Sequence, residues 1–298
     1  MSDEVVVLRN PGAGKGRHRG SLPSVLERLG SAGRPVRVLE ANSAVEAEAA
    51  CRQAVADGAG ALVAIGGDGT VHLAQQAVAG TGVPLGVIPA GTGNDFATSA
   101  GLPTDLFAAA DAVAAALRDG RARALDLARL TTPDGQTRWF GAVLAAGFDA
   151  IVNERGNRMR WPRGPIRYDI AVLLELARLR ARRYQVTVDG QQREIDAILL
   201  AVGNTSRYGG GMRICPDADP TDGLLDMVWA EPVSRTTLIR IKPRVYSGTH
   251  VTHPKVRSLR ARSITLATDD IVCYADGERI CPLPITIEAV PGAVSLLA

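Results

Sequence analysis

The sequence has few cysteines and few aromatic residues, and these shortages exclude several classes of protein. Its four cysteines, Cys51, Cys215, Cys273 and Cys281, form no C-x-x-C pair and no His/Cys ligand spacing. Neither a disulfide framework nor a zinc site is therefore expected. Aromatic residues make up 4% of the chain and the net charge is only +3. This composition leaves little for stacking or neutralising nucleic acid, so no nucleic-acid partner is expected.

Long apolar runs are also missing. No run reaches the length of a membrane span, and the first ten residues, MSDEVVVLRN, lack the basic and long apolar segments of a signal peptide. We therefore expect a cytoplasmic protein. With 298 residues, 46% of them hydrophobic, the chain is long enough for two domains of ordinary size.

The pattern of strands and helices changes along the chain. Residues 1–130 alternate apolar strands such as EVVVLR, ALVAIG and PLGVIPAG with helices that begin near Ser21, near Ser43 and after Thr70. This alternation predicts an α/β domain with a parallel sheet. Residues 131–298 are mostly short strands bounded by Gly, Asp and Pro, which predicts a β-rich, antiparallel sandwich domain. We expect the extreme C-terminus to pack back on the first domain.

Three strand-to-helix loops of the first domain are rich in glycine. They comprise Asn10-Pro11-Gly12-Ala13-Gly14-Lys15-Gly16, Gly66-Gly67-Asp68-Gly69-Thr70 and Gly91-Thr92-Gly93-Asn94-Asp95. Glycine lets backbone N–H groups approach an anion closely, and a following helix adds the positive end of its dipole. Loops at the carboxyl ends of parallel strands converge on one crevice, so one phosphate ligand can touch all three. A plain turn is the alternative for each loop.

The first loop matches neither of two common nucleotide motifs. A Walker A motif needs Gly where Arg9 stands and Ser or Thr where Gly16 stands, and a dinucleotide fingerprint needs Gly in place of Arg17. Lys15 remains as a phosphate contact or as part of a simple turn. Acids are the better candidates for chemistry, because the four histidines lack partners at ligand spacing.

A set of motifs, taken together, resembles a known family. In order along the chain are Asn10-Pro11, GGDGT, IPAGTGNDFA, Asn204 followed by GGGMRICPDADPTDGLLD, and YADGE. This combination resembles the soluble bacterial diacylglycerol kinases, especially the actinobacterial type, within the diacylglycerol kinase catalytic-domain superfamily. The resemblance covers essentially the whole chain.

The resemblance implies roles for these residues. Those expected to bind ATP are Asn10, Pro11, Gly12, Ala13, Gly14, Lys15, Gly66, Gly67, Asp68, Gly69, Thr70, Thr92, Asn94 and Asp95. Asp68 and Asp126 would work with Mg²⁺ and its waters, and either Glu278 or Asp276 would accept the proton of the attacking hydroxyl. Asp126 as a simple strand-end turn residue is the alternative.

The resemblance also implies a second magnesium site away from the phosphates. Its ligands would be Asp219, Asp222 and the backbone carbonyl of Leu224, although Asp219 stands where the family pattern usually has Lys. A second departure is Ala41, with Ser43 nearby, where relatives often place a nucleotide-binding threonine.

We therefore predict transfer of the ATP γ-phosphate to the primary hydroxyl of diacylglycerol, giving phosphatidic acid. A ceramide-like or sphingosine-like alcohol and NAD are alternative acceptors, and a nucleotide-binding regulator without turnover is the non-enzyme alternative. The sequence leaves the acyl-chain preference and a homodimer open.

A basic segment suggests how such an enzyme would reach a membrane. It holds nine arginines, Arg155, Arg158, Arg160, Arg163, Arg167, Arg178, Arg180, Arg182 and Arg183. Apolar residues recur at helical spacing over 166–181. Arginines favour anionic lipid headgroups, so we expect peripheral contact with an anionic membrane. The alternative is that the apolar face covers the sheet and the last arginines stabilise a helix C-terminus.

Overall fold

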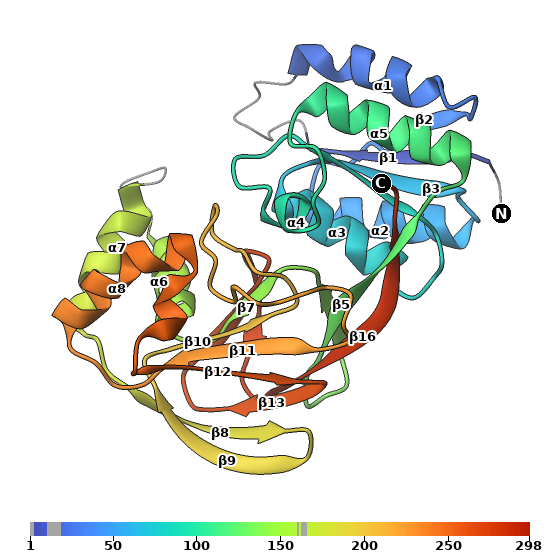
Figure 1. Ribbon diagram of the computed structural model, residues 1–298. Coiled ribbons are helices and arrows are strands. Elements are labelled where there is room, and N and C mark those ends of the chain that lie inside the picture. The colour runs from blue at the N-terminus through green and yellow to red at the C-terminus, as the bar shows by residue number, and fades with distance from the viewer. Residues whose placement is uncertain (1–2, 11–18, 160, 162–165) are drawn as a thin grey trace.

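The computed structural model describes residues 3–10, 19–159, 161 and 166–298, and shows two packed parts (Figure 1). The N-terminal part contains β1 (Val5–Arg9), η2 (Arg19–Ser21), α1 (Leu22–Gly30), β2 (Val36–Val38), α2 (Ala44–Ala56), β3 (Ala61–Gly66), α3 (Asp68–Val78), β4 (Leu85–Pro89), α4 (Asp95–Ser99) and α5 (Leu106–Asp119). Strands β2, β1, β3 and β4 pair in that order, all in parallel.

Helices cover both faces of this parallel sheet. Alternate residues of β1 and β3 pack against α2 and α3 on one face and against α1 and α5 on the other. Strand β3 is accordingly apolar along its whole length, because both of its faces are buried. The helix at Ala44 begins where the sequence predicts it, with the Ser43 hydroxyl accepting a hydrogen bond from the N–H of Glu46.

The C-terminal part contains strands of two β-sheets, together with three α-helices among the described residues. Its elements are β5 (Arg123–Thr131), β6 (Thr137–Phe140), β7 (Val143–Ala145), α6 (Phe148–Arg158), α7 (Ile166–Ala177), β8 (Arg182–Val188), β9 (Gln191–Ala197), β10 (Leu199–Gly203), β11 (Leu225–Ala230), α8 (Arg235–Ser247), η3 (Thr249–Thr252), β12 (Val256–Ala261), β13 (Ser263–Ala267), β14 (Val272–Ala275), β15 (Glu278–Pro282) and β16 (Ile285–Leu296). One sheet has the order β12-β11-β10-β7-β14-β15. Its inner face packs on β5, β8, β13 and β16 of the other sheet, forming one shared core.

The last strand joins the two parts. Strand β16 runs antiparallel to β13 and β5 in the C-terminal part, and at its end Leu296 pairs in parallel with Leu85 of β4. Figure 1 accordingly shows the C-terminus lying beside the N-terminal sheet. A single ten-stranded sheet therefore runs through both parts of the molecule.

The predicted fold class, an α/β part followed by a β-rich sandwich, is confirmed. Several local expectations need correction. The helix after GGDGT begins at Asp68 rather than after Thr70. The stretch WFGAVLAAGFDA (residues 139–150), whose apolar pattern predicts one strand, is divided among the end of β6, β7 and the start of α6. Helix α8 was not anticipated by the sequence pattern.

The basic segment also differs from its prediction. Helix α7 ends at Ala177, directly before Arg178, whereas Arg182 and Arg183 belong to β8. Leu173 and Leu174 are 66% and 44% exposed, so this apolar face is not covered by the sheet. Arg160 and Arg163 lie outside the described residues. No helix in the described part of the chain is long and apolar enough to cross a membrane.

Candidate active site

The GGDGT stretch forms a tight strand-to-helix turn. Strand β3 ends at Gly66, Gly67 is the N-cap, and Asp68 is the first residue of α3. The Thr70 side chain folds back over Gly66, where an added Cβ would lie 2.2 Å from the Thr70 hydroxyl oxygen. Glycine is therefore required at position 66, and the turn presents the N-terminus of α3 as an anion-binding end.

The third glycine-rich loop packs directly against this turn. A Cβ at Gly91 would lie 2.4 Å from the Cα of Gly67, so the two backbones touch. Asn94 adopts a left-handed conformation (φ 53°) and its side-chain oxygen accepts the N–H of Gly91 at 3.0 Å. The convergence expected at the carboxyl ends of β3 and β4 is thus observed for these two loops.

Asp68 is an acid whose charge is disfavoured by its surroundings. Burial and the neighbouring carboxylates of Asp95 and Asp276 raise its pKa from 3.8 to about 6, although the Phe96 N–H donates to its Oδ1 at 3.2 Å. The environment of Asp68 is therefore one in which a bound cation would be favourable.

Asp95 connects the third loop to the C-terminal part. Its carboxylate is buried and accepts the N–H groups of Gly210 and Gly211 at 2.8 and 2.7 Å. These two glycines have positive φ, which lets both N–H groups point at one acid. Asp95 thereby fixes the position of the GGGMR loop beside Asp68.

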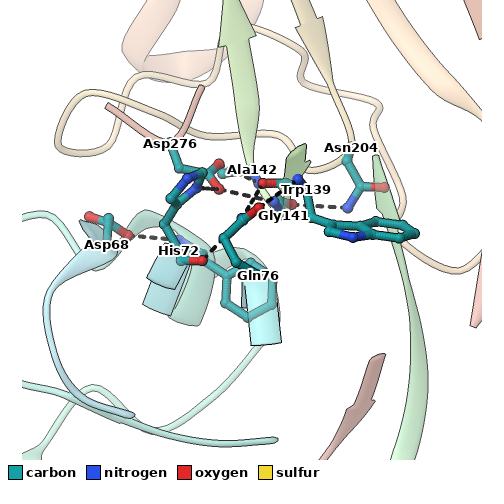
Figure 2. Close-up of polar contacts among 9 residues, drawn as sticks. Asp68, His72, Gln76, Trp139, Gly141, Ala142, Asn204 and Asp276 are labelled. Carbon is teal, nitrogen blue, oxygen red and sulfur yellow. Dashed lines mark hydrogen bonds and ion pairs between the residues drawn. The ribbon is translucent and has the colours of Figure 1, made fainter. Parts of the chain in front are cut away.

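Asp276 is held by three donors, as Figure 2 shows. The N–H groups of Gly141 and Ala142 donate to its carboxylate at 3.0 and 2.8 Å, and Nδ1 of His72 lies 3.1 Å from Oδ2. The His72 and Asp276 side chains are 7% and 5% exposed. Asp276 is thus a buried carboxylate whose orientation is fixed by three neighbouring groups.

Glu278 is differently placed. It is exposed at the start of β15, and a Cβ at Gly69 would lie 2.7 Å from its Oε1. The carboxylate therefore lies against the GGDGT turn, although it comes from the other part of the chain. The absence of a side chain at Gly69 makes this approach possible.

Asp126 connects backbone segments that surround the site, which we call its frame. Its carboxylate accepts the N–H groups of Gly223 and Gly292 at 2.7 and 2.8 Å, and it is 4% exposed. The side-chain amide of Asn204 donates to the backbone oxygens of both Asp126 and Gly141. Asp126 is thereby linked through Asn204 to the segment that holds Asp276.

The Asp219–Leu224 turn shows local hydrogen bonding. Asp219 accepts the N–H and hydroxyl of Thr221, while Asp222 accepts the N–H of Leu224 and forms an ion pair with Arg260. Among the described residues, no group of three or more His, Cys, Asp or Glu side chains is placed to hold a metal ion. A cation at this turn would therefore depend on backbone carbonyls and share Asp222 with a guanidinium.

A cavity of about 710 Å³ opens beside the acids. Asp68, Thr92, Asp95 and Asp276 line one region of it. Apolar side chains from α6, α7, α8 and the six-stranded sheet line the rest, including Val152, Val172, Leu176, Ile214, Val228 and Leu238. The arrangement places a reactive acidic end next to a chamber suited to hydrocarbon.

The structure thus brings together residues 66–70, Thr92, Asn94, Asp95, Asp276 and Glu278. Asp219, Asp222 and Leu224 belong to a separate turn, to which Asp126 is joined through Gly223. The N–H of Asn10 donates to the oxygen of Ile65, next to the GGDGT turn. Pro11, Gly12, Ala13, Gly14 and Lys15 lie outside the described residues.

Two further residues at this site were missed by the sequence reasoning. His72, which has no partner at ligand spacing in the sequence, pairs with the distant Asp276, and Gln75 lines the cavity. Both follow Asp68 at helical spacing, four and seven residues on, so they share its face of α3. That periodicity was the signal available in the sequence. The group that pairs with His72 and most of the residues that line the cavity beside Gln75 come from distant segments.

Comparison with known proteins agrees along the whole chain. Residues 4–130 match the diacylglycerol kinase catalytic domain, and residues 142–298 match the YegS C-terminal NAD kinase beta sandwich-like domain. A diacylglycerol kinase of Mycobacterium tuberculosis is 44% identical over 99% of this chain and 94% of its own length. One from Staphylococcus saprophyticus is 27% identical, over 95% and 92% of the two chains.

A solved structure supports the same fold. A diacylglycerol kinase from Bacillus anthracis superposes with a TM-score of 0.73, covering 99% of this chain and 96% of its own, at 21% identity. This chain thus places two glycine-rich turns, a set of acids from both parts of the chain and an apolar cavity in the same overall architecture as that structure.

Proposed function

We propose that this chain, which belongs to the diacylglycerol kinase family, transfers the γ-phosphate of ATP to the primary hydroxyl of diacylglycerol and so forms phosphatidic acid. Residues 1–130 would bind the nucleotide and residues 131–298 the lipid. The observation that carries the proposal is the cavity in which Asp68 and Asp276 adjoin an apolar chamber. NAD, the alternative acceptor, is water-soluble and carries no hydrocarbon chain that would fill that chamber.

Glu278 is the better candidate for the proton acceptor. Asp276 already accepts three hydrogen bonds, which hold its carboxylate against Gly141, Ala142 and His72. Glu278 is exposed and lies over Gly69 in the turn that would hold the phosphates. The lipid hydroxyl would attack the γ-phosphorus, its proton would pass to the Glu278 carboxylate, and ADP would leave.

The acids also fit a magnesium–nucleotide complex. Magnesium in proteins is usually held by one or two carboxylates together with substrate phosphates, and it neutralises phosphate charge when bound. Asp68 and Asp95 would hold it, and the raised pKa of Asp68 fits a site that is completed by a cation. The glycine turn at residues 66–70, with Thr92 and Asn94, would bind the phosphates through backbone N–H groups. Residues 10–15 would complete the nucleotide site.

The lipid would enter the cavity from the membrane, at a protein surface formed by α7 and α8. Both helices line the cavity, and Leu173, Ile239 and Tyr246 on them are 66%, 54% and 51% exposed. Helix α8 also carries Arg240, Lys242 and Arg244. Apolar side chains beside cations favour the interface of an anionic membrane. We therefore propose peripheral contact at this surface, of which α7 belongs to the basic segment that begins at Arg155.

A phosphoryl-transfer assay with a panel of acceptors tests the proposal. The purified chain is incubated with radiolabelled ATP, Mg²⁺ and diacylglycerol, ceramide, sphingosine or NAD. We expect label in the lipid product from diacylglycerol. Preferential labelling of ceramide, sphingosine or NAD would assign a different acceptor, and nucleotide binding without transfer to any of the four would favour the regulator.

A further inference from the structure

Gln75 is a buried side chain whose hydrogen-bonding groups are unused. It is 0% exposed, yet neither its Nε2 nor its Oε1 has a hydrogen-bond partner among the described residues. It lies on α3 and lines the same cavity as Asp68. An unpaired buried amide destabilises the folded state, so its presence in a cavity wall points to a ligand that pairs with it.

The adjacent glutamine behaves in the opposite way. The Gln76 Nε2 donates to the Trp139 oxygen at 2.7 Å and to the His72 oxygen at 3.2 Å, and its Oε1 accepts the Trp139 N–H at 2.9 Å. Two glutamines of one helix therefore differ sharply. The Gln76 side chain joins α3 to β6, whereas the Gln75 side-chain amide has no hydrogen-bond partner among the described residues.

The Gln75 amide lies beside Gly141 and Phe96. A Cβ at Gly141 would lie 2.3 Å from its Nε2 and 2.7 Å from the ring of Phe96. The space that Gly141 leaves is thus occupied by the amide and the ring. Phe96 also lines the cavity, so the amide lies next to the cavity wall.

We propose that Gln75 recognises an ester carbonyl of the acceptor lipid, by donating a hydrogen bond from Nε2. This inference rests on the proposed function and specifies its substrate as an ester-linked glycerolipid. Seven residues of helix separate Gln75 from Asp68, a rise of roughly 10 Å. With the reacting hydroxyl at the acids, the ester groups of the same lipid extend along α3 toward Gln75, while the acyl chains fill the apolar chamber.

Paired acceptors test this proposal. Dioleoylglycerol and the matching diether glycerol differ in their carbonyls, so the wild-type enzyme should show an acceptor KM about five- to tenfold lower for the diester, the scale of one hydrogen bond. In Gln75→Met the diester KM should rise to the diether value, while the KM for ATP stays unchanged. A wild type that does not discriminate, or a variant that still does, would overturn the inference. Transfer to neither lipid would instead overturn the proposed function and the inference with it.

Thermal stability separates recognition from a structural role. Gln75→Met removes an unpaired amide and should raise the Tm of the ligand-free protein, whereas Gln76→Met breaks three hydrogen bonds and should lower it. A fall in Tm for Gln75→Met that matches the fall for Gln76→Met would show that Gln75 serves the fold, and would overturn the inference.

Discussion

Replacement of Asp126 tests whether this acid organises the frame of the site. Its carboxylate binds the N–H of Gly223, in the turn that follows Asp222, and the N–H of Gly292, within β16. The same carboxylate therefore connects β5 to the strand that joins both parts of the molecule. Asp126→Ala would remove the acceptor for two backbone donors at once.

The expected loss follows from those two bonds. Hydrogen bonds to a charged group contribute about 1.5–3 kcal/mol each, so Asp126→Ala should cost roughly 3–6 kcal/mol of unfolding free energy. Asp126→Asn keeps one acceptor oxygen and should cost about half as much. For a chain of this size a loss of 1 kcal/mol lowers Tm by roughly 2–4 °C, so both changes are large enough to measure.

Circular dichroism melting curves of the two variants provide the assay. Asp119→Asn is a suitable control, because Asp119 is a surface acid with 47% exposure whose ion pairs contribute little. If Asp126→Asn kept the wild-type Tm but lost turnover, the carboxylate would act on magnesium and phosphate rather than on the frame. That result would refute the structural reasoning.

Three other changes are open to measurement. Burial raises the pKa of Asp149, whose carboxylate accepts a hydrogen bond from the Tyr208 hydroxyl, from 3.8 to about 6. The contribution of Asp149 to the unfolding free energy is therefore present below about pH 4 and lost as pH rises through 6. In urea titrations, the difference in unfolding free energy between wild type and Asp149→Asn should fall by up to roughly 3 kcal/mol from pH 4 to pH 7. A difference that stays constant over this range would contradict the prediction. Asp222→Ala should abolish any rise in Tm that Mg²⁺ gives the wild type without ATP, and an equal rise in both proteins would exclude Asp222 as a ligand. Leu173→Ser with Leu174→Ser should weaken sedimentation with anionic vesicles while activity on detergent-dispersed lipid persists; unchanged sedimentation would place the docking surface elsewhere.

Local patterns were sufficient to predict the N-terminal part of the fold. A buried strand followed by Gly-Gly-Asp-Gly-Thr specifies a turn and a helix start within a few residues, and the structure has both. The meeting of Gly67 with Gly91 also followed from the rule for carboxyl ends of parallel strands. In each case the information lies within one βα unit or in the order of such units.

Other features depend on contacts between distant segments. The pairing of Leu296 with Leu85 joins the chain end to β4, and nothing in the local apolar pattern specifies that partner. Helix α8 contains Pro243 in its interior, a residue that normally argues against a helix, so the sequence pattern did not indicate it. The proposed preference for Glu278 over Asp276 likewise depends on the donors from Gly141 and Ala142, which only the folded chain brings near.

The most direct test of the account measures radiolabelled phosphatidic acid formed from Mg-ATP and diacylglycerol by wild type, Asp68→Ala and Glu278→Ala. We expect the wild type to form the product, and each variant to be slower by at least about a hundredfold, the scale of losing a general base or a metal-organising carboxylate. Both variants should retain the wild-type circular dichroism spectrum. Near-normal product formation by folded Asp68→Ala and Glu278→Ala would contradict the central claim that these two acids, from opposite parts of the chain, form one kinase site.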